Sequence, residues 1–262
     1  MSELTDTRWL RPCAGHWRAG SGPVLLCLPH AGGGALSYAG WDRYPLGGFE
    51  PVAVCLPGRE DRFAEDPVSG WAALVSAIAD SLTPLAHRPL AVFGHSMGAL
   101  TGYELLRELA RRKRPAPLLL AVSAHRAPQE MPTAAGLPRS PRELLDYVRR
   151  LDDGGTAELL DDPEWRDLVL RPLSADLRLH DTYRSSAEPP GQPPLATPFV
   201  VLTGEDDPTV SDRTYTGWAA LTHAVSARRV YPGGHFYLRE QRERLLTELG
   251  RDLENAMRGE LR

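Results

Sequence analysis

The sequence predicts an α/β protein with a mostly parallel central sheet, helices on both faces, and an inserted helical segment. Two observations predict this class. Short apolar runs alternate with amphipathic stretches along most of the 262 residues, and several runs end in glycine-containing loops. Strands that alternate with helices form parallel sheets whose faces the helices cover. The length suits one domain over residues 1–262.

Each expected element follows from its own pattern. A compact apolar run followed by loop residues predicts a buried strand within 22–34, 49–60, 89–96, 117–128, 198–208 and 223–236. Apolar residues at helical spacing predict helices over 71–85, 97–114 and 238–257. The alternation is that of a doubly covered parallel sheet.

The alternation breaks between about residues 128 and 188. Helical patterns alone fill this stretch, at 141–151 and 163–184, and Ser140 and Pro141 form a typical helix start. We expect an insertion placed over one end of the sheet.

Bulk properties exclude several classes. The net charge is −4, so no basic field suggests a nucleic-acid partner. No stretch approaches 18 apolar residues, so we expect no membrane span. The beginning, MSELTDTRWLRP, lacks the apolar core of a signal peptide. We therefore expect a cytoplasmic protein.

Gly94-His95-Ser96-Met97-Gly98 fits the pattern G-x-S-x-G. Three fixed positions alone are weak, but this copy lies between a predicted strand and a predicted helix, which is the setting of a nucleophile elbow. Flanking glycines permit the sharp turn, and the helix start directs positive dipole at an oxyanion. Ser96 is the candidate nucleophile, and a purely structural serine in a tight turn is the alternative.

His235 is the candidate base. It lies in PGGHF, after a predicted strand and before the last helix, where the chain order Ser, Asp or Glu, His places it. His95 neighbours Ser96, but adjacent residues on an elbow point apart. His30 and His125 both follow predicted strands, so we expect them near the same edge of the sheet, with His30 in a pocket loop. His180 falls in the insertion and is expected to be structural.

A carboxylate must orient the base. Glu205, Asp206 and Asp207 follow a predicted strand between Ser96 and His235. Spacing alone leaves the choice open, with Asp207 favoured and Asp206 second. A solvated acidic loop is the alternative.

The oxyanion site requires two backbone N–H groups, one after the nucleophile and one from the loop after an early strand. Met97 and Ala31, in PHAGGG, are the candidates. A glycine-rich turn without a ligand is the alternative for that loop. The sequence holds neither a HExxH motif nor Cys/His metal spacing, so we expect no metal.

Together, LPHAGGGALSY, LPGREDRF, FGHSMGAL, RPLSADLRLHDTY, LTGEDDPTVS and YPGGHFYL resemble the type II thioesterases of polyketide and nonribosomal peptide assembly lines. The resemblance covers nearly the whole chain, from about residue 22 to the final helix. It implies an α/β-hydrolase fold with a helical lid at about 128–188. It makes Ser96, His235 and Asp207 the catalytic triad, and Ala31 and Met97 the oxyanion donors.

The resemblance also implies a substrate and partners. Family members hydrolyse acyl thioesters from the phosphopantetheine arm of acyl or peptidyl carrier proteins, so no cofactor of the enzyme itself is expected. The lid is expected to gate an apolar chamber, and candidate lining residues are Trp165, Leu168, Leu170 and Leu173, although core packing is an alternative for most. Candidate contacts to an acidic carrier are Arg59, Arg62, Arg139 and Arg142, against the alternative of solvated arginines.

Three other functions use the same residues differently. A general carboxylesterase or acyl-CoA thioesterase would act without a carrier. A cyclising thioesterase is usually fused to its synthetase, and this chain shows no such segment. A noncatalytic carrier-binding protein would keep the fold and lose turnover. The pathway, the acyl preference and the oligomeric state are not predicted.

Overall fold

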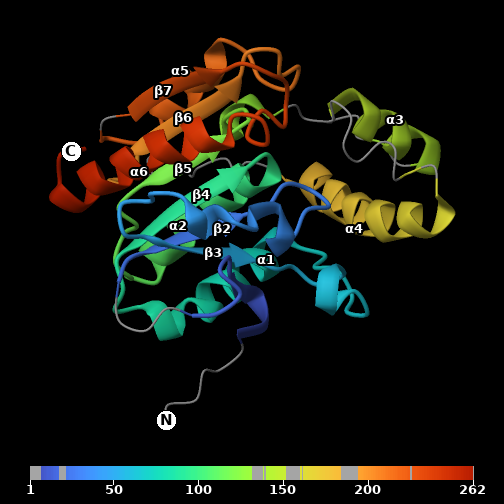
Figure 1. Ribbon diagram of the computed structural model, residues 1–262, viewed down its shortest axis with the longest axis horizontal. Helices are drawn as coiled ribbons and strands as arrows, with labels where there is room; N and C mark the ends of the chain where they lie inside the picture. Colours follow the sequence, from blue (N-terminus) through green and yellow to red (C-terminus); the bar gives the residue numbers. More distant parts are fainter. Residues whose placement is uncertain are drawn as a thin grey trace.

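The computed structural model describes residues 7–17, 22–131, 138, 140–151, 160, 162–183, 194–224 and 226–261. These residues form a seven-stranded sheet in the order β1-β3-β2-β4-β5-β6-β7 (Figure 1). The strands are β1 (Leu10–Pro12), β2 (Val24–Leu28), β3 (Glu50–Val54), β4 (Leu90–His95), β5 (Leu120–Ser123), β6 (Phe199–Gly204) and β7 (Ser226–Tyr231). All neighbouring strands pair in parallel except β1 and β3. The mostly parallel sheet is confirmed.

Helices cover both faces of this sheet. The α-helices are α1 (Trp71–Ser81), α2 (Met97–Arg111), α3 (Pro141–Leu151), α4 (Pro163–Asp181), α5 (Arg213–Ala219) and α6 (Arg242–Arg258). On one face, strand residues such as Leu26 and Val92 pack with residues of α1, α2 and α5. On the other face, Leu25 and Phe93 pack with α6 and with the 3-10 segments that follow β2. Alternate strand residues thus supply two separate cores.

The predicted order of elements matches the structure, with two omissions. Strand β1 has three residues and pairs antiparallel at the sheet edge, with Leu10 opposite Val54. A run this short carries no period-2 pattern. Helix α5 has seven residues and buries Trp218 fully. It is too short to show a helical repeat clearly.

Helices α3 and α4 lie together at one side of the molecule, on the right in Figure 1 and away from α6. Their chain positions fall between β5 and β6, within the stretch for which an insertion is predicted. The two helices and Leu160, which lies between them in the chain, form a separate apolar cluster of Leu144, Leu160, Leu170, Leu173 and Leu177. Residues 132–137, 139, 152–159, 161 and 184–188 of the predicted 128–188 insertion lie outside the described residues, and its role as a lid stays a prediction.

Helix α3 begins with a reciprocal cap. The Glu143 backbone N–H donates to the Ser140 hydroxyl at 3.3 Å, and the Ser140 N–H donates to the Glu143 carboxylate at 2.9 Å. This arrangement satisfies two N–H groups that a helix start leaves without partners. Among the described residues, no helix is long and apolar enough to cross a membrane.

Candidate active site

Ser96 sits at a strained turn between β4 and α2. Its backbone has φ of 53° and ψ of −123°, a conformation that non-glycine residues rarely adopt. The flanking glycines permit the close crossing of strand and helix. A Cβ at Gly94 would lie 2.1 Å from the Gly98 carbonyl oxygen, and one at Gly98 would lie 2.1 Å from the Leu28 carbonyl oxygen. The turn therefore requires glycine at both positions and has the form of a nucleophile elbow.

His235 and Asp207 form a buried pair. His235 Nδ1 lies 2.9 Å from Asp207 Oδ2, and both residues are at most 5% exposed. Burial alone would raise the pKa of Asp207, but hydrogen bonds from His235 and Thr209 outweigh it, so the pKa of this carboxyl is lowered. Asp207 is therefore charged at neutral pH, as an orienting carboxylate must be.

The three candidate acidic residues have different surroundings in the structure. Asp207 is the one that contacts His235, whereas the side chains of Glu205 and Asp206 are exposed. Asp206 is held through its backbone, whose N–H donates to the Gly233 carbonyl at 3.0 Å. The position of Asp207 thus agrees with the favoured reading of the sequence.

Thr209 is a site residue that the sequence analysis missed. Its hydroxyl donates to Asp207 Oδ1 at 2.7 Å, and its backbone N–H donates to the same oxygen at 2.9 Å. The hydroxyl also lies 3.2 Å from His235 Nδ1. An Asp followed two residues later by an N–H partner is a common turn pattern, which was the available signal. Thr209 fixes the Asp207 oxygen that His235 does not use.

Two cavities meet at Ser96 and His235. The larger, of about 520 Å³, has an exposed rim that includes Leu36 and Arg239. The smaller, of about 190 Å³, is lined by described residues of which none is exposed, among them Met131. Both the candidate nucleophile and the candidate base therefore face open space on two sides.

The candidate oxyanion donors lie at the same junction. Ala31 lines both cavities, and Met97 lines the smaller one. Within the described part of the chain, the backbone N–H of neither residue donates a hydrogen bond. Met97 is also the first residue of α2, where the helix dipole is positive. These two groups are free to bind a negative oxygen formed near Ser96.

The other predicted histidines have distinct surroundings. His30 lines the larger cavity, as expected of a pocket-loop residue. His95 is buried away from both cavities, and its Nδ1 lies 2.9 Å from the Ser123 hydroxyl. Burial, reinforced by the neighbouring His235, lowers the pKa of His95. His95 is thus part of the core rather than a base for Ser96.

His125 and His180 form a pair that lines the smaller cavity. Their Nε2 atoms lie 3.0 Å apart, and His125 Nδ1 lies 2.7 Å from the Arg126 carbonyl oxygen. Burial is the main cause that lowers the pKa of His125 to about 3 and that of His180 to about 4. Both rings are therefore neutral at neutral pH. His180 connects α4 to His125, which fits the expected structural role, and it also lines the smaller cavity.

Only some of the residues predicted to line the chamber do so in the structure. Leu168 and Leu173 line the larger cavity. Leu170 packs instead in the cluster shared by α3 and α4. The side chain of Trp165 lies outside the described residues.

Two predicted carrier contacts are wrong. Arg59 is 4% exposed and Arg62 is 5% exposed, so neither side chain can meet a partner surface. Arg59 binds Asp176, and Arg62 binds Glu65 at 2.7 Å. Arg142 is exposed on α3 and stays a candidate. Arg139 lies outside the described residues.

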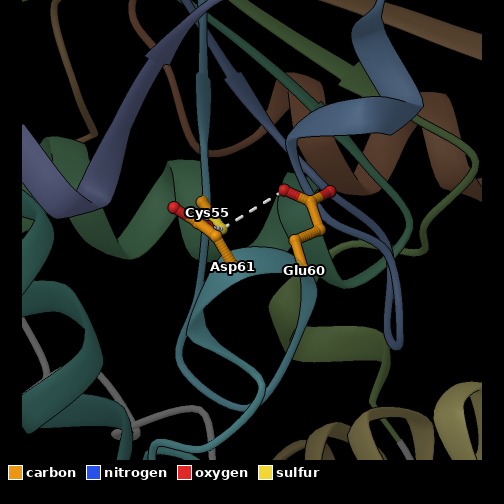
Figure 2. A group of neighbouring side chains, drawn as sticks. All are labelled: Cys55, Glu60 and Asp61. Carbon is orange, nitrogen blue, oxygen red and sulfur yellow. Dashed lines mark hydrogen bonds between the residues drawn. The ribbon is translucent and has the colours of Figure 1, made fainter.

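Cys55, Glu60 and Asp61 form a compact cluster after β3 (Figure 2). The Cys55 thiol contacts Glu60 Oε2 at 3.3 Å, and burial together with Glu60 raises the pKa of this thiol to about 12. Asp61 already accepts from Arg11 at 2.7 Å, and Glu60 Oε1 accepts from the Leu36 N–H at 2.9 Å. A protonated thiol and an arginine cation both oppose a metal ion, so we assign the cluster a structural role.

The chain is similar to proteins of the thioesterase family. A family model described as a thioesterase domain matches residues 23–253. Gramicidin S biosynthesis protein GrsT of Aneurinibacillus migulanus is 31% identical over 231 residues, which are 87% of this chain and 88% of that protein. Thioesterase PikA5 of Streptomyces venezuelae is 33% identical over 244 residues, which are 92% of this chain and 84% of that protein.

Solved structures of thioesterases are similar to this chain along most of its length. The type II thioesterase BorB from the borrelidin biosynthetic cluster superimposes with a TM-score of 0.81 and 32% identity, over 97% of this chain and 99% of that chain. The RedJ thioesterase from the prodiginine pathway of Streptomyces coelicolor gives a TM-score of 0.79 and 34% identity, over 90% of each chain. The predicted α/β-hydrolase fold is confirmed.

Proposed function

The chain belongs to the thioesterase domain family, and from that premise we propose that it hydrolyses acyl thioesters carried on the phosphopantetheine arm of acyl or peptidyl carrier proteins. The predicted class of thioester hydrolase is confirmed by the family, and so is the resemblance to type II thioesterases. Relatives named for gramicidin S biosynthesis and for the borrelidin cluster support a role in peptide or polyketide synthesis.

One observation supports the chemistry most strongly. The strained Ser96, the His235–Asp207 pair, and the unpaired N–H groups of Ala31 and Met97 converge at the junction of two cavities. In the proposed first step, Ser96 Oγ bonds to the thioester carbonyl carbon while His235 Nε2 takes its proton. The two backbone N–H groups stabilise the oxyanion.

The intermediate then collapses in the same site. The carbon–sulfur bond breaks, and the His235 imidazolium gives its proton to the departing pantetheine sulfur. Water next attacks the acyl-Ser96 carbonyl and gives a proton to His235, which returns it to Ser96 Oγ as the acid leaves. Asp207 stabilises the imidazolium in both halves.

The cavities suggest how the substrate lies. The larger cavity has an exposed rim, with Leu36 75% exposed, so it suits an arm that enters from a carrier. The smaller one has no exposed described lining residue and suits the acyl group. Its volume of about 190 Å³ is less than half the 520 Å³ of the larger cavity, so a short acyl group is the expected fit.

The test compares the same acyl group attached to three different leaving groups. Purified protein is given the same short acyl group on a phosphopantetheinylated carrier protein, on coenzyme A and on nitrophenol. The proposal predicts the highest kcat/KM for the carrier thioester. In a second series on the carrier protein, with acyl chains of increasing length, the rate should fall as the chain lengthens. Faster hydrolysis of the nitrophenyl ester than of the carrier thioester would indicate a general carboxylesterase. Binding of the carrier without turnover would indicate a noncatalytic partner.

A further inference from the structure

A buried ion pair joins α4 to the loop that follows β3. Arg59 Nη1 donates to Asp176 Oδ2 at 2.6 Å, and Arg59 Nη2 donates to Asp176 Oδ1 at 2.8 Å. Asp176 is 3% exposed and Arg59 is 4% exposed. Two parallel hydrogen bonds between charged groups fix both side chains in direction as well as in distance.

The same two side chains also hold the loop that carries Ala31. The Gly32 backbone N–H donates to Asp176 Oδ2 at 2.7 Å, and Arg59 Nη1 donates to the Gly33 carbonyl at 2.7 Å. One carboxylate and one guanidinium thus bind peptide groups at two successive residues. Ala31, whose N–H is the candidate oxyanion donor, directly precedes this clamped segment.

Gly32 is the residue that permits the close fit. Its φ of +78° lies in the left-handed region, and an added Cβ would lie 3.0 Å from the Leu173 Cβ. Helix α4 therefore abuts the loop directly. Because the peptide after Ala31 is held from α4, rotation of the Ala31 backbone is restricted.

We propose that Asp176 is a positioning residue for the oxyanion site, acting through Gly32 and Arg59 to keep the Ala31 N–H directed at Ser96. The inference rests on the proposed function. It also means that the carboxyl-terminal half of α4 belongs to the catalytic scaffold. Asp176 itself lines neither cavity that meets at Ser96, so its effect on the reaction is indirect.

The direct test is Asp176→Asn. An asparagine presents an NH₂ group where one Asp176 oxygen accepts, so the fork to Arg59 breaks and the guanidinium is left unpaired. Because a well-placed oxyanion donor contributes about 10²–10³ to kcat, a misdirected one should lower kcat about 10–100-fold. KM should change less than kcat, because Asp176 itself lines neither cavity and only its partners Arg59 and Gly32 touch the larger one.

Glu50→Gln provides the matched control. Glu50 pairs with Arg88 at 2.6 Å, and both residues are at most 9% exposed. This pair lies at the amino ends of β2 and β3, whereas Ser96 lies at the carboxyl end of the parallel strand β4. The variant therefore removes a comparable buried ion pair from a place without a proposed role. A purely structural role for Asp176 predicts that the two variants behave alike once corrected for folded fraction.

The decisive readout is binding of a transition-state mimic. An acyl trifluoromethyl ketone reacts with a serine hydroxyl to form an oxyanion, whereas the corresponding alcohol does not. Asp176→Asn should weaken the ketone at least tenfold and the alcohol less than threefold. Equal weakening of both ligands, or a ketone loss no greater than in Glu50→Gln, would overturn the inference. A wild-type protein that binds no ketone would instead overturn the proposed function.

Arg59→Lys gives a second variant in case Asp176→Asn does not fold. Lysine keeps the positive charge near Asp176 but cannot reproduce the two-pronged contact. Asp176 then retains the Gly32 N–H, so the expected loss in ketone affinity is smaller, about three- to tenfold. A ketone affinity equal to that of the wild type would contradict the proposed clamp.

Discussion

At the residue scale, the division of roles between two adjacent acids is the sharpest feature of the site. Asp207 is buried against His235, and Asp206 is exposed beside it. They are chemically identical side chains, two and three residues after the end of β6 at Gly204. Comparing a variant of each aspartate therefore distinguishes the effect of the contact with His235 from the effect of an acidic side chain nearby.

Asp207→Asn should lower kcat by about 10³–10⁴, because an amide holds His235 in the wrong tautomer and cannot stabilise the imidazolium. Asp206→Asn is the matched control and should leave kcat within about twofold, since its side chain is exposed. Steady-state kinetics on an acyl-carrier thioester measures both. A larger loss in the Asp206 variant would refute the assignment of the orienting carboxylate.

The residues that sequence reasoning found are those marked by local pattern. Ser96, Asp207 and His235 each follow a recognisable strand, and parallel strands bring their carboxyl ends to one edge. Arg59 and Asp176 lie 117 residues apart, and their contact depends on how α4 packs on the Gly32 loop. No local pattern encodes that packing, so Arg59 was assigned to a surface that it does not reach.

At the element scale, α4 is tied to the rest of the molecule at several points beyond Asp176. The Trp71 indole N–H donates to the Leu179 carbonyl at 2.8 Å, and His180 contacts His125 at 3.0 Å. Arg171 donates to the Phe63 carbonyl at 3.2 Å. By contrast, α3 buries Leu144 and Leu151 and packs with α4 through apolar side chains. If the predicted insertion gates the site, we therefore expect α3, and not α4, to move.

Hydrogen exchange distinguishes the two helices. Backbone amides in the carboxyl-terminal half of α4 should exchange at least tenfold more slowly than those of α3, because opening α4 breaks buried polar contacts as well as apolar ones. Mass spectrometry of peptides from 141–151 and 172–181 gives the comparison. Equal protection of both peptides would argue that the insertion moves, or stays fixed, as one body.

Element recognition from sequence worked where patterns were long. Helices α2 and α6, with 15 and 17 residues, show their apolar faces over several turns. The boundaries of α3 coincide with the predicted range because a proline and a cap mark its start. The three-residue β1 and the seven-residue α5 are defined by the neighbours they pack against, which is tertiary information.

At the scale of the whole molecule, buried neutral histidines should make stability depend on pH. The pKa of His125 is lowered to about 3 when folded, against about 6.5 in an unfolded chain. Between these values the unfolded state binds a proton that the folded state does not. The free energy of unfolding should therefore fall as pH drops below about 6.5, by about 1.4 kcal/mol per pH unit for this group.

His125→Gln should flatten that dependence by about one proton between pH 6 and 4.5. Urea unfolding at several pH values measures the slope. His223→Gln is the control, because it also removes one histidine but from an exposed position outside the His125–His180 pair. An unaltered slope in His125→Gln, with a normal slope in the control, would mean that His125 is protonated in the folded protein.

If Ser96 attacks a carrier-bound thioester, an acyl group must be attached to it during turnover, and this acyl-enzyme can be trapped. The protein is mixed with a short-chain acyl-carrier thioester, quenched in acid within milliseconds to seconds, and digested for mass spectrometry. We expect a transient acyl mass increment on the Ser96 peptide of the wild type and none in Ser96→Ala, which should also lose turnover by at least about 10³-fold. Hydrolysis of the thioester by Ser96→Ala at the wild-type rate would show that Ser96 is not the nucleophile.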